Sequence, residues 1–164
     1  MIRSALFVCC FILSSLVQTS LVQASDWPMQ VSGVPSRIVD GDTIHLDGHK
    51  IRLLGIDTPE MRQFCQDSNG ADWPCGIRAR DMLAGMVGAS TQVDCVISGR
   101  DRYKRLLGRC FAGSLDVQRA LIAAGFGVAE YTPDYQDEEA KAKQLKLGMW
   151  AGTFERPRVY RKSH

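Results

Sequence analysis

The side chains of this chain that could do chemistry begin with carboxylates and a guanidinium placed beside short apolar stretches. Asp40 and Asp42 flank a glycine in Asp-Gly-Asp-Thr, Arg52 lies in Ile-Arg-Leu-Leu, and Asp57 begins the run Asp-Thr-Pro-Glu, which ends at Glu60. Carboxylate oxygens suit a hard cation such as Ca²⁺, an arginine fork suits phosphate oxygens, and a loop glutamate can deprotonate water. These residues therefore indicate a site for a cation and a phosphate.

Each of these residues also has a purely structural interpretation. An Asp-Gly-Asp triplet is commonly a solvated turn, Asp57 could cap backbone amides, and Arg52 could be the outward residue of an alternating strand. Glu60 could be a solvated loop residue, and Arg105 a surface charge beside a turn. The pairing of Asp42 with Asp57 favours the metal site, because two separate strand ends that each offer an aspartate can build one cation site.

A basic segment at residues 101–105, Asp-Arg-Tyr-Lys-Arg, follows these carboxylate motifs, and residues 156–162 are also rich in arginine and lysine. Taken together and in this order, the carboxylate motifs and the segment at residues 101–105 resemble the staphylococcal nuclease (thermonuclease) family. The resemblance runs from about Ile38 to Trp150. It implies a nuclease domain over residues 37–152, with residues 25–36 as a lead and 153–164 as a basic tail.

The resemblance implies a calcium site and a catalytic base. Asp42, Asp57 and the main-chain carbonyl of Thr58 match the family's Ca²⁺ ligands, with Asp40 close behind in a supporting position. Glu60 matches the carboxylate that orients or deprotonates the attacking water.

The resemblance also implies a set of groups that contact the substrate. Arg52 and Arg105 match the two guanidiniums that grip the scissile phosphate and offset the charge of the transition state. Arg102, Tyr103 and Tyr131 match residues that line the nucleotide pocket, where a ring can stack on a base.

One position in the basic segment departs from the family pattern. Lys104 stands where the family usually has glycine, in Asp-Arg-Tyr-Gly-Arg. If this position requires a positive φ, a lysine costs on the order of 1 kcal/mol and could shift Arg105. The loop after Glu60 also departs, because it carries two cysteines and Trp73.

The first 24 residues have the pattern of a secretory signal peptide. A single positive charge at Arg3 precedes a mostly apolar stretch, and small residues lead to a cleavage point after Ala24. A retained N-terminal anchor is the alternative interpretation. Cleavage would remove 24 of the 164 residues and leave 140, enough for one domain with one core, with a net charge of +1 in place of +2. Such a balance does not by itself indicate a nucleic-acid binder, so the placement of the charges matters.

Four cysteines would remain after cleavage, and an even number in an exported chain favours disulfides. Three pairings can be drawn. If the alternating runs around Cys95 and Cys110 pair across the turn at residues 99–105, their sulfurs could face each other, and Cys65 would then join Cys75. A zinc site is the competing interpretation, but none of the spacings is the short Cys-x₂₋₄-Cys pair of structural zinc sites.

The elements that must position these side chains are expected to be strands first and helices later. Short apolar stretches from Ile38 to Leu53, with a tight turn at residues 47–48, predict the first strands, and residues 61–74 predict a loop. Helices are expected from about residue 77 to 88, 116 to 125 and 136 to 147. This order matches a mainly β fold with α, a five-stranded antiparallel oligonucleotide-binding (OB) barrel with three helices.

The resemblance thus predicts a Ca²⁺-dependent endonuclease that hydrolyses DNA and RNA to 3′-phosphate ends with little sequence specificity. We expect it to be exported to the periplasm or the medium, to be free of the membrane after signal removal, and to act as a monomer without a stable protein partner. A noncatalytic nucleic-acid-binding module on the same barrel is the main alternative, and a Ca²⁺-stabilised structural protein is another. The retained arginines and carboxylates favour the enzyme.

Overall fold

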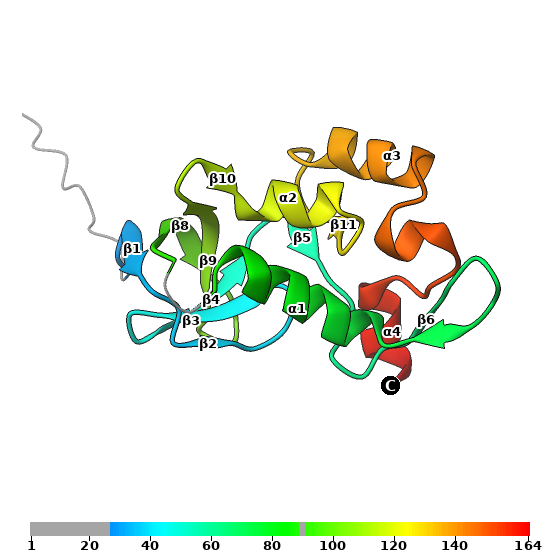
Figure 1. The fold of residues 1–164 in the computed structure, drawn as a ribbon. Helices are drawn as coiled ribbons and strands as arrows, with labels where there is room; N and C mark the ends of the chain where they lie inside the picture. Colours follow the sequence, from blue (N-terminus) through cyan, green and yellow to red (C-terminus); the bar gives the residue numbers. More distant parts are fainter. Residues whose placement is uncertain (1–26, 89–90) are drawn as a thin grey trace, which may run out of the picture.

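The computed structural model describes residues 27–88 and 91–164 (Figure 1). The expected signal peptide at residues 1–24 and its cleavage after Ala24 therefore lie outside the described residues. No helix within the described ranges is long and apolar enough to cross a bilayer.

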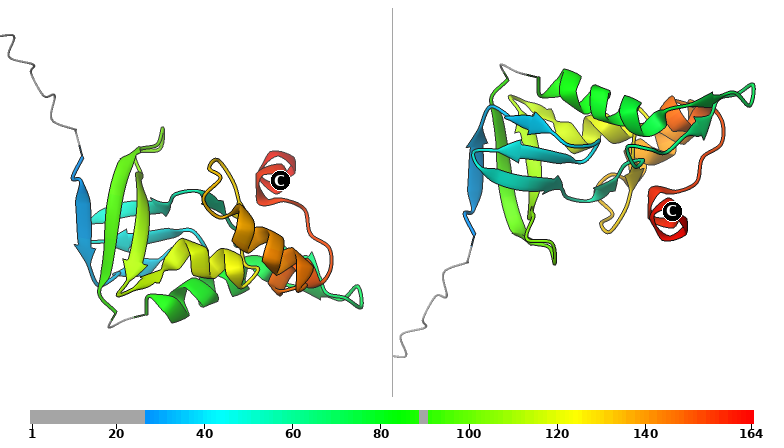
Figure 2. Two further views of the ribbon diagram at one scale, coloured as in Figure 1. Left: turned by 90° about the horizontal axis from the view of Figure 1, so that it is seen from above. Right: turned by 90° about the horizontal axis from the view of Figure 1, so that it is seen from below.

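A curled sheet forms one side of the molecule, and helices gather on the other side (Figure 2). Its strands follow the order β1-β8-β9-β4-β3-β2, with β10 paired to β9. Their bounds are β1 Gln30–Gly33, β2 Arg37–Ile38, β3 Thr43–Leu46, β4 His49–Leu53, β8 Val93–Arg100, β9 Leu106–Ala112 and β10 Leu115–Asp116.

Two further pairs of short strands form separate two-stranded ribbons. In one, β5 (Ile56–Asp57) pairs with β11 (Val128–Ala129), which brings the Asp57 strand next to the segment that leads to Tyr131. In the other, β6 (Cys65–Gln66) pairs with β7 (Asp72–Trp73). The helices are α1 Cys75–Met86, α2 Val117–Ala123, α3 Gln136–Gln144, the 3₁₀ helix η1 Gly148–Ala151, and α4 Pro157–Ser163.

The core lies between the sheet and the helices. Alternate strand residues point inward, since Ile44 and Leu46 on β3 and Ile51 and Leu53 on β4 are almost fully buried, as a half-buried strand pattern requires. Leu83 on α1 and Leu121 on α2 join the same core cluster. Arg52 lies between two of these core residues and therefore faces the opposite side of the sheet.

Both disulfides that the cysteine pattern suggested are present. Cys95 and Cys110 are opposite each other in the β8–β9 register and are bonded, and Cys65 is bonded to Cys75. The first bridge lies within the sheet, and the second ties the β6–β7 ribbon to the start of α1.

The structure confirms the mainly β fold with helices and corrects several details. The sheet is mixed, because β4 and β9 pair in parallel, which the intervening chain with α1 allows as a long crossover. Strand β1, which pairs with β8, falls in the predicted lead at residues 25–36. The predicted loop at 61–74 contains the β6–β7 ribbon, and a fourth helix, α4, occupies the predicted tail at 153–164, with Pro157 in its first turn.

Candidate active site

The Asp-Gly-Asp segment is a tight connection between β2 and β3 that packs directly on the Asp57–Glu60 segment. A Cβ atom on Gly41 would lie 2.7 Å from the hydroxyl oxygen of Thr58 and 2.9 Å from the Cβ of Ala79, so only glycine fits this contact. Both Thr58 N–H and Thr58 Oγ1 donate to Asp42 Oδ2, at 3.2 and 3.1 Å. Asp40 Oδ1 accepts from the Asp42 N–H at 3.1 Å, so it supports the turn from outside.

Arg52 bridges the two aspartates. Strand β4 pairs with β3 so that Arg52 lies opposite Thr43, next to Asp42. One terminal nitrogen of Arg52 donates to Asp42 Oδ1, and the other donates to Asp57 Oδ1 at 2.7 Å. Burial alone would lower the Arg52 pKa, but the two carboxylates outweigh it and raise the pKa.

Asp42 is buried, with about 3% of its surface exposed. Burial, together with the nearby negative charges of Asp40 and Asp57, outweighs the opposing effect of Arg52 and raises the Asp42 pKa to about 7. A carboxyl in this position is stabilised in its charged form by additional positive charge. The electrostatics of the segment therefore favour a bound cation.

Glu60 is held on a loop that packs against the first turn of α1. A Cβ atom on Gly76 would lie 1.8 Å from the Glu60 carbonyl oxygen, so the backbone of α1 approaches this loop as closely as glycine permits. The Gln63 side chain accepts from the Glu60 N–H at 3.2 Å and donates to the carbonyl of Glu155 at 2.6 Å. These contacts fix the backbone and leave the Glu60 carboxylate to project towards the pocket.

The basic segment is a turn between β8 and β9 that is organised by Asp101. Asp101 Oδ1 accepts from the N–H groups of Tyr103 and Arg105, both at 2.9 Å, and Asp101 Oδ2 accepts from Arg105 Nε at 2.7 Å. Partial burial raises the Asp101 pKa, but the hydrogen bonds from Arg105 and Tyr103 outweigh this and lower it. Asp101 therefore stays ionised and holds the Arg105 guanidinium by its Nε edge.

Lys104, which stands where the family usually has glycine, adopts a left-handed backbone conformation. Lys104 has φ of +65°, the conformation that a glycine adopts without cost. The Lys104 N–H donates to the Asp101 carbonyl at 3.0 Å, and Arg105 keeps its contact with Asp101. The lysine therefore introduces backbone strain without displacing the arginine from its partner.

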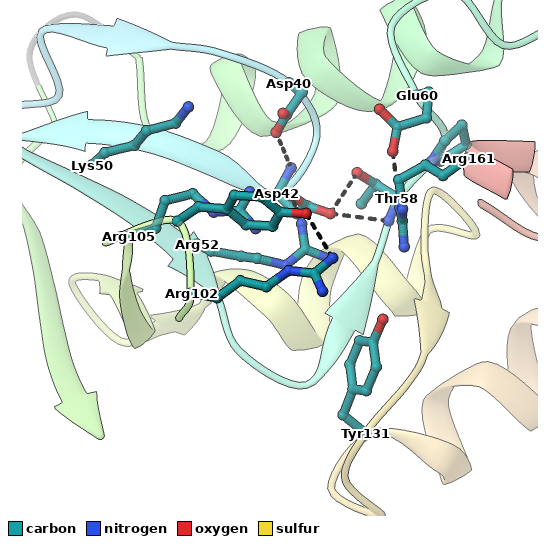
Figure 3. Close-up of a pocket in the computed structure, with 12 residues that line it drawn as sticks. Asp40, Asp42, Lys50, Arg52, Thr58, Glu60, Arg102, Arg105, Tyr131 and Arg161 are labelled. Carbon is teal, nitrogen blue, oxygen red and sulfur yellow. Dashed lines mark hydrogen bonds and ion pairs between the residues drawn. The ribbon is translucent and has the colours of Figure 1, made fainter. Parts of the chain in front are cut away.

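These segments converge on one pocket of about 490 Å³, a size suited to a nucleotide (Figure 3). Most of the predicted site residues line it: Asp40, Asp42, Arg52, Thr58, Glu60, Arg102, Tyr103, Arg105 and Tyr131. Asp57 is fully buried beneath the pocket and reaches it through its carboxylate contacts.

The aromatic residues of the pocket are exposed, as a stacking platform for a base requires. Tyr103 and Tyr131 are 64% and 63% exposed. The Arg102 guanidinium lies 4.7 Å from the centre of the Tyr103 ring and donates to the Tyr103 hydroxyl at 2.6 Å. The ring of Tyr103 is thereby held beside the positive charges of this rim.

Two charged pocket residues were absent from the set predicted from the sequence. Lys50 lines the pocket beside Arg52, and the alternation of β4 places both on one face, so strand periodicity could have found it. Arg161 enters from α4 at the far end of the chain (Figure 3). It donates from Nη1 to Asp57 Oδ1 and Glu60 Oε1 at 2.9 and 2.8 Å, and from Nη2 to Asp57 Oδ2 at 2.9 Å. Only the basic character of residues 156–162 hinted at it.

The oxygen atoms gathered here are of the kind that binds a hard divalent cation. Asp42 and Asp57 offer carboxylate oxygens next to the Thr58 backbone, with Asp40 behind them, and oxygen ligands of this kind suit Ca²⁺. No cluster of three or more histidine, cysteine, aspartate or glutamate side chains is arranged as a ready-made metal cage within the ranges the structure describes. The guanidiniums of Arg52 and Arg161 stand between the carboxylates.

Comparison with known proteins relates most of the described domain to one family. The family model described as staphylococcal nuclease homologue matches residues 50–152. The chain is 38% identical to the succinoglycan biosynthesis protein ExoI of Rhizobium meliloti, over 69% of this chain and 61% of that protein. It is 32% identical to an uncharacterized endonuclease of Escherichia coli O157:H7, over 76% and 82% respectively.

A further relative is the probable endonuclease LCL3 of Pyricularia oryzae, 32% identical over 70% of this chain and 49% of that protein. The chain thus spans between about half and three fifths of ExoI and LCL3. The similarity to those two proteins is therefore limited to part of each of them.

Proposed function

This chain belongs to the staphylococcal nuclease family, and we propose on that premise that it is a Ca²⁺-dependent endonuclease that hydrolyses the phosphodiester bonds of DNA and RNA with little sequence specificity. The observation that supports this most is the convergence of Asp42, Asp57 and Glu60 with Arg52 and Arg105 in one pocket. A module that only binds nucleic acid needs the positive charge but has no use for this carboxylate cluster.

In the proposed mechanism, Asp42, Asp57 and the carbonyl of Thr58 would hold the metal, with Asp40 supporting Asp42. When bound, Ca²⁺ supplies Lewis-acid polarisation of the phosphate and offsets charge that develops on its oxygens. Glu60, whose backbone is fixed by Gln63, accepts the proton of the attacking water.

The two arginines act on the phosphate in the proposed mechanism. Asp101 holds Arg105 by Nε, which leaves the terminal nitrogens of Arg105 available to donate to phosphate oxygens. Arg52 supplies the second guanidinium from strand β4. Arg105 is positioned before the substrate arrives, so it stabilises the pentacoordinate transition state without reorganising at that moment, whereas Arg52 would have to exchange its contacts with Asp42 and Asp57 for phosphate oxygens.

Substrate recognition in this proposal depends on stacking and charge rather than on base edges. The exposed rings of Tyr103 and Tyr131 can stack on any base, and Arg102 and Lys50 add positive charge to the rim. Neither group reads a sequence or a 2′-hydroxyl. This arrangement supports our proposal that the chain accepts both DNA and RNA.

The proposal includes export and a monomeric state. Two disulfides fit an oxidising compartment such as the periplasm or the medium. Cell fractionation tests the location, and light scattering of the purified protein tests the monomer.

A cleavage assay tests the enzymatic proposal. Purified protein is incubated with plasmid DNA and with a structured RNA, in Ca²⁺ and in EGTA, together with a Glu60→Gln variant. We expect degradation of both substrates in Ca²⁺, none in EGTA, and a large loss of rate in Glu60→Gln. Retained DNA binding by gel shift without any Ca²⁺-dependent cleavage would instead identify a noncatalytic module.

A further inference from the structure

Arg161 places a positive charge on the carboxylates that the proposed metal needs. Its two terminal nitrogens engage both oxygens of Asp57, and Nη1 also reaches Glu60. This is the bidentate geometry in which a guanidinium binds a carboxylate most strongly. A divalent ion that approaches Asp57 from the pocket would meet this fork on the same carboxylate.

The charge balance explains why the guanidinium lies there. Asp57 is fully buried, and its Oδ1 accepts from both Arg52 and Arg161. Three carboxylates, Asp42, Asp57 and Glu60, thus share two guanidiniums. Burial of such a cluster without positive charge is costly, so Arg161 takes the electrostatic role that a bound cation would otherwise fill.

The helix that carries Arg161 is attached lightly. Helix α4 has seven residues, of which only Pro157 is buried, and Val159 is 50% exposed. Its contacts include a hydrogen bond from the Tyr160 hydroxyl to the Arg62 carbonyl at 3.2 Å and a long ion pair of Arg158 with Glu130 at 3.5 Å. A segment with so little buried surface can move away without disrupting the core.

We propose that Arg161 is an internal counter-cation that competes with the divalent metal for Asp57 and Glu60, so that metal binding releases Arg161 and loosens α4. This inference rests on the metal site of the proposed function. Release of Arg161 also frees the Glu60 carboxylate, which cannot accept a proton from water efficiently while it is held in an ion pair. Arg161 therefore lowers the apparent affinity for the metal and couples metal binding to exposure of the catalytic base.

Calcium titration of the full chain tests the competition. Isothermal titration calorimetry would compare the wild type with Arg161→Gln, Arg161→Lys and the matched control Arg158→Gln, which lies on the same helix and contacts Glu130 instead of Asp57. We expect Arg161→Gln to bind Ca²⁺ roughly 3- to 10-fold more tightly, the range for a partly exposed bidentate charge pair. Arg161→Lys, which keeps the charge but loses the fork, should fall between the two, and Arg158→Gln should match the wild type.

Hydrogen exchange gives a readout that does not depend on activity. In the wild type, Ca²⁺ should speed exchange of the α4 amides by severalfold, because the helix loses its anchor at Asp57. In Arg161→Gln these amides should already exchange fast without Ca²⁺, while the amides of β8 and β9 stay protected and show that the fold is intact.

The outcomes separate this inference from the function on which it rests. Unchanged or weaker Ca²⁺ affinity in Arg161→Gln, with normal binding by the wild type, overturns the competition and leaves the metal site standing. Absence of Ca²⁺ binding in both proteins overturns the metal site and the inference together. Slower exchange of α4 on addition of Ca²⁺ also contradicts the inference, because it would show that the metal and Arg161 bind at the same time.

Discussion

Replacement of Arg105 by lysine isolates the part of this site that should act only in the transition state. Arg105 uses Nε to bind Asp101 at 2.7 Å, and its side chain is about 20% exposed towards the pocket. Its terminal nitrogens can then donate two parallel hydrogen bonds to a phosphate. A lysine has one ammonium group, which must choose between Asp101 and the phosphate, so at least one donor is lost while the charge remains.

The size of the effect follows from this count of donors. Removal of one preorganised donor to a developing oxyanion costs ~10²- to 10³-fold in rate. Because lysine keeps the positive charge, we expect the lower end, a fall in kcat of ~10²-fold or about 2.7 kcal/mol. The Michaelis constant should change by less than about threefold, since the charge that attracts the polyanion is retained.

The assay measures initial rates on a fluorophore- and quencher-labelled oligonucleotide in saturating Ca²⁺. Arg109→Lys is the matched control, because Arg109 grips Asp116 through Nε and Nη2 in a similar way but lies outside the pocket. Asp101→Asn should lower kcat by about tenfold, and it should add little when combined with Arg105→Lys, since both changes disturb one arrangement. A variant Arg105→Lys with normal kcat and a strongly raised Michaelis constant would refute the reasoning and make Arg105 a binding residue.

The remaining predictions concern the metal, the pH dependence, the disulfide and the turn. Asp42→Asn should abolish Ca²⁺ binding by calorimetry while circular dichroism stays native; unchanged Ca²⁺ affinity would remove Asp42 from the site. In EDTA, the Asp42 pKa of about 7 means that the folded state holds a proton that the unfolded state releases near pH 4. The contribution of Asp42 to the free energy of unfolding should therefore decrease as the pH rises from about 4 to 7. Urea titrations of the Asp42→Asn protein should lack this pH dependence. Cys65→Ser with Cys75→Ser should cost roughly 3 kcal/mol or less in the same titrations, as expected for a short loop. Lys104→Gly should raise stability by about 0.5 kcal/mol, because relief of the left-handed strain exceeds the added chain entropy, whereas Lys104→Ala should not.

The sequence predicted which side chains gather at the pocket better than it predicted the sheet, because short motifs identify those side chains whereas the sheet depends on long-range pairing. Asp42 directly precedes β3 and Asp57 ends the two-residue strand β5, so the motifs around them, and not a strand period, identified them. The parallel pairing of β4 with β9 joins residues that are more than 50 positions apart, such as Ile51 and Leu106. No local pattern distinguishes that pairing from an antiparallel one, because both bury the same alternate residues.

The β6–β7 ribbon was missed for a related reason. Residues 61–74 have no apolar period, and two-residue strands leave no pattern to find. The turn chemistry was nevertheless visible, since Gly70 has φ of +80° next to Asn69. The Cys65–Cys75 bridge closes the ribbon and supplies the constraint that local propensity lacks.

Arg161 is a site residue that sequence motifs could not predict. It lies 104 positions after Asp57 in a helix with almost no buried face, so neither periodicity nor spacing assigns it to the site. What assigns it is the electrostatic demand of buried carboxylates, which any positive charge within reach can meet. The same demand is the physical basis of the proposed metal site, because a cluster that holds two guanidiniums is one that a divalent cation can also neutralise. Competition between Arg161 and the metal is therefore a direct consequence of placing Asp42, Asp57 and Glu60 together.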